Sequence, residues 1–277
     1  MVNKPPYRAF SKAVVTTTKK PSPAQEELAR SIADHMDVAY YRYRSSIQRL
    51  RENQDADYAV VVGREKIRIQ WDGGDFYHHP GISVYRVGVS KITPFIAALR
   101  PVWGGRTLDT TMGMGRDALV MADRTENKVL GFEKHPAIAV LTHLGLQSLT
   151  RMKRFRKVVP RISVVRGDSF RVMAGLLQPR FDYVLLDPMF PKPVSGSRDM
   201  EVMHRLTTPF PFDNELLRLA ARSAKRRVLM RWPAHVPVPS VGFDIAIPGA
   251  RKTTVYLVLN LNRPGTRRRL GCPRSIV

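Results

Sequence analysis

From Arg106 onward, short apolar runs alternate with segments of helical periodicity. The strand-like runs cover residues 107–111, 129–133, 162–167, 183–187, 227–232, 243–247 and 254–261. Such alternation is typical of βαβ units, in which helices connect parallel strands. Only Pro248-Gly249 and a few further residues separate the last two runs, which favours a closing antiparallel hairpin. The pattern predicts an α/β fold with a Rossmann-like, doubly wound sheet of seven strands.

A small α/β module with a basic arm is predicted before this sheet, over residues 1–77. Ser22, Pro23 and Gln25 form a helix start, because a capping hydroxyl and a capping-box partner flank a proline at the first helical position. Two strand-like runs, 58–62 and 65–71, are separated by Gly63-Arg64 and are predicted to form a hairpin. The expected division is therefore 1–77, a Rossmann-like domain over 78–262 and a basic tail over 263–277.

The charge of the chain favours a polyanionic partner. Lys and Arg number 46 against 23 Asp and Glu, a formal net charge of +23. Two stretches, 151–161 and 263–274, are densely basic and are predicted to contact phosphates of RNA. The alternative explanation for the charge is an organism whose proteins are basic in general.

The remaining composition narrows the setting. The single cysteine, Cys272, excludes a disulfide framework and disfavours a cysteine-based metal site, so no metal is expected. No apolar run of about 18 residues and no secretory leader is visible, so we expect a soluble, cytoplasmic protein. The pair His78-His79 precedes Pro80-Gly81 at the predicted domain junction, and its role stays open. Trp71, Trp103 and Trp232 are expected in packing contacts rather than as platforms for bases.

A glycine-containing loop follows the first of the seven strands. Asp109, Gly113, Gly115, Arg116 and Asp117 lie in this loop, and Glu133 follows twenty residues after Gly113. Glycines let the backbone turn sharply and approach a ligand, and the distant acid is where a ribose hydroxyl is bound. The loop fits both NAD and S-adenosylmethionine.

Two acids near the loop favour S-adenosylmethionine. Asp109 and Asp117 suit a ligand that carries an ammonium and a sulfonium, and they disfavour a pyrophosphate. Asp168-Ser169 follows the third strand, where a polar pair can bind the adenine amino group. Asp168 is equally consistent with a simple helix cap.

The segment Asp187-Pro188-Met189-Phe190-Pro191 ends the fourth strand and predicts the chemistry. An exocyclic amine of a base is a poor nucleophile, because its lone pair is delocalised into the ring. The Asp187 carboxylate and the Pro188 carbonyl are predicted to accept its two N–H groups, while Phe190 stacks on the base.

These motifs together resemble the small-subunit ribosomal RNA guanine-N2 methyltransferases that carry a DPMFP motif. The resemblance rests on the segments 109–118, 132–136, 186–191 and 225–233, and it covers residues 78–260. It implies a methyltransferase sheet and S-adenosylmethionine as cofactor. The implied cofactor contacts are Arg116, Asp117, Glu133, Lys134, Asp168, Ser169 and Asp187.

The chain departs from that family in places. It has Thr111-Met-Gly-Met-Gly115 where the family has Ala-Gly-Leu-Gly, and Lys134 where the family has Arg. The target nucleotide of that family therefore cannot be assigned to this chain. Two groups of alternatives stay open: another acceptor, such as adenine N6 or a protein carboxylate, and a non-catalytic RNA-binding protein.

Overall fold

The computed structural model contains two compact units. It describes residues 7–44, 46–81, 87–88, 92–189, 198–207, 213–239, 242–250, 253–266 and 270. Contacts group residues 1–79, 135–148 and 189–209 into one unit, and residues 80–134, 149–188 and 210–277 into the other. The N-terminal unit and the C-terminal unit, as we call them, are described separately. Phe190, Pro191, Cys272 and most of the basic tail lie outside the described residues.

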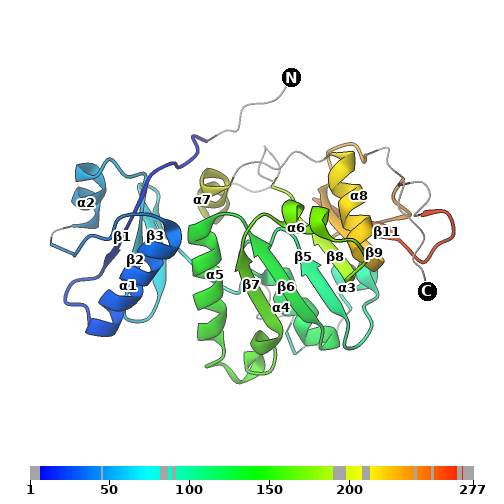
Figure 1. Ribbon diagram of the computed structural model, residues 1–277, viewed down its shortest axis with the longest axis horizontal. Helices are drawn as coiled ribbons and strands as arrows, with labels where there is room; N and C mark the ends of the chain where they lie inside the picture. Colours follow the sequence, from blue (N-terminus) through cyan, green and yellow to red (C-terminus); the bar gives the residue numbers. More distant parts are fainter. Residues whose placement is uncertain are drawn as a thin grey trace. The chain divides into compact units, whose positions relative to one another are not determined.

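The C-terminal unit is built on the predicted seven-stranded sheet. Its strands are β5 (Arg106–Asp109), β6 (Lys128–Glu133), β7 (Ile162–Arg166), β8 (Phe181–Leu186), β9 (Ala224–Pro233), β10 (Ile245–Pro248) and β11 (Thr254–Asn260). They lie in the order β10-β11-β9-β8-β5-β6-β7. The five strands from β9 to β7 are mutually parallel, whereas β11 is antiparallel to both β9 and β10 (Figure 1). The α/β, Rossmann-like fold and the closing hairpin are thus confirmed.

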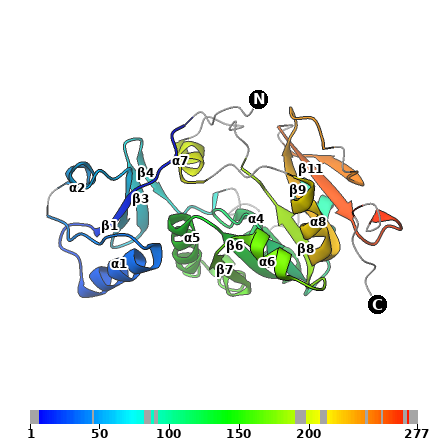
Figure 2. The same cartoon turned by 45° about the horizontal axis from the view of Figure 1, so that its top comes forward.

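Helices connect the parallel strands. In this unit α4 (Arg116–Thr125), α6 (Ser169–Gly175) and α8 (Asn214–Ser223) lie between successive parallel strands, whereas α3 (Pro94–Leu99) precedes β5. Two 3-10 turns cover Lys153–Phe155 and Val159–Arg161. Helices α6 and α8 lie side by side (Figures 1 and 2). The inner strands are apolar and buried, as Leu108, Val184 and Val228 illustrate. Because parallel strands end at one edge, the loops after β5, β6, β7 and β8 meet there.

The N-terminal unit contains a four-stranded sheet. Its elements are β1 (Ala13–Thr17), α1 (Pro23–Met36), α2 (Ile47–Asn53), β2 (Tyr58–Val62), β3 (Ile67–Trp71) and β4 (Gly74–Tyr77), together with α7 (Arg198–Leu206) and most of α5 (Pro136–Leu149). Strand β1 pairs in parallel with β2, and the next two pairs are antiparallel. The predicted hairpin and the capping box at Ser22 are confirmed. Strand β4 was not predicted, because the glycines at 73 and 74 interrupt the strand pattern.

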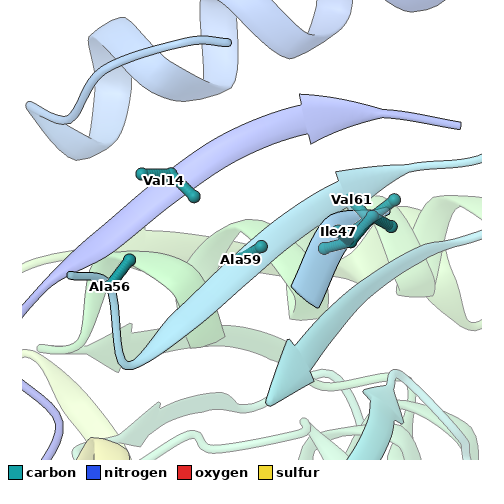
Figure 3. Close-up of a cluster of buried hydrophobic side chains, with 5 residues drawn as sticks. All are labelled: Val14, Ile47, Ala56, Ala59 and Val61. Atoms are coloured by element: carbon teal, nitrogen blue, oxygen red, sulfur yellow. The ribbon is translucent and has the colours of Figure 1, made fainter. Parts of the chain in front are cut away.

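The core of this unit forms around β2, whose five residues are all buried. Val14 of β1, Ile47 of α2, and Ala59 and Val61 of β2 pack together with Ala56 (Figure 3). Among the described residues, no helix in either unit combines the length and the apolar character that crossing a membrane requires.

Candidate functional site

The carboxyl edge of the parallel strands gathers the predicted site residues of the C-terminal unit. Asp109 ends β5, Glu133 ends β6, and Asp187 follows β8 directly. The glycine loop connects β5 to α4, and Asp168-Ser169 begins α6 after β7. Strand pairing of β5 with β6 and β8, and of β6 with β7, brings these strand ends side by side.

The glycine loop makes a tight turn over the end of β6. Gly113 and Gly115 have positive φ angles of 49° and 68°, a conformation that favours glycine. The Gly113 N–H donates to Glu133 Oε2 at 3.0 Å, and the Met112 N–H donates to the Phe132 carbonyl at 2.9 Å. A direct hydrogen bond therefore joins the glycine loop to the acid that the sequence predicted to bind the ribose.

The loop approaches the sheet so closely that β6 needs a glycine beneath it. A Cβ atom added to Gly131 would lie 1.7 Å from Met112 Sδ. Met112 itself is buried, with 4% of its surface exposed. Sequence reasoning did not single out Gly131, because the contact joins residues from different elements.

Three carboxyl groups and one guanidinium form an ionic cluster at this edge. Arg231 of β9 donates through Nη2 to Asp117 Oδ2 and through Nη1 to Asp187 Oδ2. Asp109 is buried beside them and accepts the Thr111 N–H through Oδ1 at 3.2 Å. Arg231 links the cofactor loop to the predicted acceptor residue. The sequence contained it only within the resemblance at 225–233, which gave it no role.

Burial and mutual repulsion shift the protonation of these acids. Burial, together with the nearby charges of Asp117 and Asp187, raises the pKa of Asp109 to about 7. Burial also raises the pKa of Asp187, and Arg231 opposes this effect. Burial by itself disfavours the charge of Arg231, but the carboxylates of Asp117 and Asp187 raise its pKa overall.

Three hydroxyl groups fasten the end of β8 to the cofactor loop and to α6. Thr110 Oγ1 donates to the Leu185 carbonyl at 2.8 Å, and the Asp187 N–H donates to Thr111 Oγ1 at 2.8 Å. Ser169 Oγ donates to the Thr110 carbonyl at 2.8 Å. Thr111 is one of the departures from the resembled family, and its hydroxyl fixes the backbone of Asp187.

The pair that follows β7 has a structural role as well. Asp168 caps α6 by accepting the Phe170 N–H through Oδ1 at 3.0 Å, while its Oδ2 lies 3.2 Å from Lys134 Nζ. The cap that the sequence allowed is therefore present. It leaves the carboxylate partly exposed, since 26% of the side chain is accessible.

Not all predicted residues can be placed in this site. Pro188 is buried next to Asp187, whereas Phe190 lies outside the described residues. His78 lies against Gly145 of α5 within the N-terminal unit. In the described ranges, no group of three or more His, Cys, Asp or Glu side chains is arranged to hold a metal ion.

The cluster fits a cationic, adenosine-containing cofactor. Asp109, Asp117 and Asp187 carry more negative charge than Arg231 alone balances, which suits an ammonium and a sulfonium. The left-handed glycines give close backbone access, and the buried Glu133 carboxylate lies beside them. Such a carboxylate is the usual partner of ribose hydroxyls.

Comparison with known proteins decides the family. The model of the family described as "Putative SAM-dependent methyltransferase" matches residues 92–241, which include the cofactor loop, Asp187 and Arg231. The chain belongs to this family of S-adenosylmethionine-dependent methyltransferases. S-adenosylmethionine is accordingly the cofactor of this methyltransferase, as its sequence predicted.

Several curated relatives carry a more specific name. The methyltransferase is 29% identical over 213 residues to ribosomal RNA small subunit methyltransferase J of Dechloromonas aromatica, an alignment that covers 70% of this chain and 85% of that enzyme. The Coxiella burnetii enzyme of the same name is 31% identical over 156 residues, covering 54% of this chain and 60% of that enzyme. An uncharacterized Bacillus subtilis protein, YpiP, is 27% identical over 252 residues, covering 88% of this chain and 96% of YpiP.

A solved structure supports the fold. The crystal structure of a SAM-dependent methyltransferase from Neisseria gonorrhoeae superposes with a TM-score of 0.65 at 20% sequence identity. The superposition covers 90% of this chain and 96% of that one. At this identity the likeness concerns the fold alone, and it includes the N-terminal part of the methyltransferase.

Proposed function

We propose that this methyltransferase modifies the exocyclic amine of a base in RNA, namely guanine N2 of small-subunit ribosomal RNA. The relatives named ribosomal RNA small subunit methyltransferase J support the RNA class. The resemblance of residues 186–191 to the DPMFP motif supports a base amine as the acceptor. The charge of +23 supports a polyanionic substrate.

The observation that carries the proposal is the position of Asp187. It lies at the carboxyl end of β8, directly beside the cofactor loop, with its backbone held by Thr111 and its Oδ2 held by Arg231. The side chain is 40% exposed, so an incoming substrate can reach its carboxylate. In the described part of the chain, Oδ1 has no hydrogen-bond partner, which leaves one carboxylate oxygen for an N–H group.

S-adenosylmethionine supplies a methyl group that its sulfonium has already activated. The work of the chain is therefore alignment. Asp187 Oδ1 accepts one N–H of the amine, and the Pro188 carbonyl accepts the other. With both N–H groups held, the lone pair of the nitrogen points toward the methyl group. A new C–N bond forms as the C–S bond breaks, and the nitrogen then releases one proton, for which Asp187 is the nearest base. Phe190 is proposed to stack on the base.

The cofactor contacts are assigned by position around this acceptor. Asp109, Gly113, Gly115, Arg116 and Asp117 are proposed to surround the methionine part. Glu133 and Lys134 are proposed to bind the ribose, Asp168 and Ser169 the adenine, and Asp187 the edge nearest the methyl group. The RNA is proposed to contact the basic stretches 151–161 and 263–274.

The setting of the reaction follows from this substrate. We propose a cytoplasmic location and a role in ribosomal RNA processing, with residues 1–77 as a separate module, 78–262 as the catalytic domain and 263–277 as a basic tail. The module is expected to contribute to recognition of the RNA rather than to chemistry.

The decisive test combines cofactor binding with methyl transfer. Calorimetry should show binding of S-adenosylmethionine and none of NAD. Asp187→Ala should abolish methyl incorporation into ribosomal RNA while leaving most RNA affinity. Asp182→Ala, a change at the opposite end of β8, is the matched control and should retain activity.

Identification of the product completes the test. Mass-spectrometric mapping of ribosomal RNA from cells that lack the protein should show the loss of one N2-methylguanosine. Loss of N6-methyladenosine instead would reject guanine as the acceptor, and full activity of Asp187→Ala would reject the role of Asp187.

A further inference from the structure

A group of exposed cations of the C-terminal unit lies at the amino edge of its sheet, opposite the cofactor loop. Arg106 begins β5 and pairs in register with Lys128, which begins β6. Arg180 precedes β8, and Lys225 and Arg226 lie at the start of β9. All five side chains are exposed. Because these strands are parallel, their starts share one edge of the sheet (Figure 1).

The stretch 151–161 and residues 263–266, the described start of the second stretch, lie at this same edge. The stretch 151–161 ends where β7 begins, and Arg161 is bonded to Glu126 just before β6. Its 3-10 turns are anchored by the buried Phe155, Val158 and Val159, while the cations at 151, 153, 154, 156 and 157 are exposed. The stretch 263–274 begins after β11, whose last residue pairs with Arg227 of β9. Residues 267–269 and 271–274 lie outside the described part of the chain.

Acidic side chains at the amino edge are few and already paired. Asp182 lies 3.2 Å from Arg226, and Glu126 lies 2.9 Å from Arg161. Asp244, with a side chain only 1% exposed, lies 3.5 Å from Arg263. The acids of the cofactor site lie instead at the carboxyl edge. Exposed cations also lie at the carboxyl edge, among them Arg116, Lys134 and Arg166. There they accompany the acids of the cofactor site, whereas the acids named at the amino edge are each paired with an arginine.

An exposed aromatic residue accompanies these cations. Trp103 precedes β5 and is 71% exposed, so the expectation that it serves in packing is wrong. The Val102 N–H donates to the hydroxyl of the buried Tyr183 at 2.8 Å, which fixes the backbone next to Trp103. An exposed indole beside Arg106 is a combination suited to stacking with an unpaired base.

We propose that the amino edge of the seven-stranded sheet is a second RNA-binding surface, separate from the methyl-transfer site. It binds phosphates through Arg106, Lys128 and the cations of 151–157, and it stacks a base on Trp103. This inference rests on the proposed function, in which the substrate is RNA, and it specifies how that RNA is bound. The six steps from Phe181 to Asp187 span about 20 Å, so the RNA must extend at least this far to reach both edges.

The salt dependence of RNA binding tests the surface without any need for methyl transfer. Log K for RNA binding falls as log salt rises. The variant Lys153→Gln/Arg156→Gln/Lys157→Gln should make this slope shallower by about 2, because each lost phosphate contact removes about 0.7–0.9 from its magnitude. The probe is transcribed small-subunit ribosomal RNA. The control Lys19→Gln/Arg44→Gln/Arg49→Gln removes the same charge from exposed positions of the N-terminal unit. It should leave the slope unchanged, and both variants should bind S-adenosylmethionine normally.

Tryptophan fluorescence tests whether a base of the RNA stacks on Trp103. Trp71 and Trp232 are only 7% and 6% exposed, so quenching by RNA should come from Trp103 and disappear in Trp103→Phe. Trp103→Ala should weaken RNA binding by about tenfold. Quenching that persists in Trp103→Phe would show that Trp103 is not part of the RNA-binding surface.

The outcomes separate the surface from the proposed reaction. An unchanged salt slope, or an equal decrease in the control variant, would overturn the surface even if Asp187-dependent methylation occurs. If methylation does occur, the triple variant should raise KM for RNA and leave kcat unchanged. Selective loss of binding without any methyl transfer would support the surface and reject the reaction.

Discussion

Asp109 is an acid that the fold holds partly protonated near neutral pH. It is 5% exposed, and burial together with Asp117 and Asp187 raises its pKa from 3.8 to about 7. In the unfolded chain the same carboxyl loses its proton near its ordinary pKa. Between these two values the folded protein therefore binds more protons than the unfolded chain, and stability falls as the pH rises.

Asp109→Asn should remove this pH dependence. The amide cannot ionise, so the variant should be more stable than the wild type at pH 8 by as much as a few kcal/mol and similar to it at pH 4. Urea unfolding between pH 4 and 8 measures the difference. The same variant should bind S-adenosylmethionine more weakly, because it loses a negative group beside the cation. A difference in stability that does not change with pH would contradict the assignment.

Arg231 should control how Asp187 is ionised. Arg231→Met leaves the effect of burial unopposed, so the pKa of Asp187 should rise further and the acid limb of the pH–rate profile should move to higher pH. We expect kcat to fall about tenfold or more near pH 7. Arg231→Lys keeps the charge and should retain more activity than Arg231→Met.

The matched control for this variant lies on the same strand. Arg226→Met also breaks an arginine–aspartate pair of β9, with Asp182, but at the far end of the strand. Its pH–rate profile should match that of the wild type. If Arg231→Met lowers stability and leaves its own profile unmoved, the residue is structural only.

Strand β6 illustrates how one element shapes another. Its Gly131 permits the close approach of the cofactor loop through Met112, while its last residue, Glu133, accepts the Gly113 N–H. The position of the loop therefore depends on a residue that has no polar group and lies outside the loop.

Gly131→Ala should displace Met112 and loosen the cofactor loop. Overpacking of a buried contact costs about 1–3 kcal/mol in stability. Calorimetry should show weaker binding of S-adenosylmethionine, since the loop backbone must shift. Gly175→Ala is the control, because a Cβ there meets no atom within 4 Å. It should leave cofactor binding unaffected, and equal losses in both variants would reject the explanation.

Most of the excess positive charge of the chain lies outside residues 1–79. Residues 1–79 contain 13 basic and 10 acidic side chains, whereas the stretch 151–161 contains six basic and no acidic ones. With residues 135–148 and 189–209 included, the N-terminal unit contains 16 basic and 12 acidic side chains, so its net charge is small. Its contribution to RNA recognition, if the proposed function holds, rests on shape and specific contacts rather than on net charge.

Salt should separate the two ligands of the molecule. Raising the salt from about 50 to 200 mM should weaken RNA binding by about a thousandfold, as expected for several phosphate contacts. Binding of S-adenosylmethionine should change by less than about tenfold, because its partners are mostly buried and weakly screened. Filter binding and calorimetry measure the two responses. Similar responses would contradict the proposal that RNA binds to an exposed basic surface and the cofactor to a buried site.

The order of strands and helices was readable from the chain because each element depends on local periodicity. The seven-stranded sheet, the hairpin at β2–β3 and the capping box of α1 all follow from residues close in sequence. The glycine loop and Glu133 were predicted to belong to one cofactor site because the spacing of a strand–loop–helix unit is nearly constant. Strand β4 was missed where glycines hide the local signal.

Contacts between distant residues were decided only by the tertiary structure. Arg231 lies 44 residues from Asp187 and 114 from Asp117, so no local pattern joins them. Likewise, the sequence showed the basic stretch 151–161 but not that it lies at the edge opposite Asp187. Sequence periodicity specifies which face of an element is buried. The order of the strands in the sheet decides which ends become neighbours, and here that order brought Asp109, Asp117 and Asp187 together around Arg231.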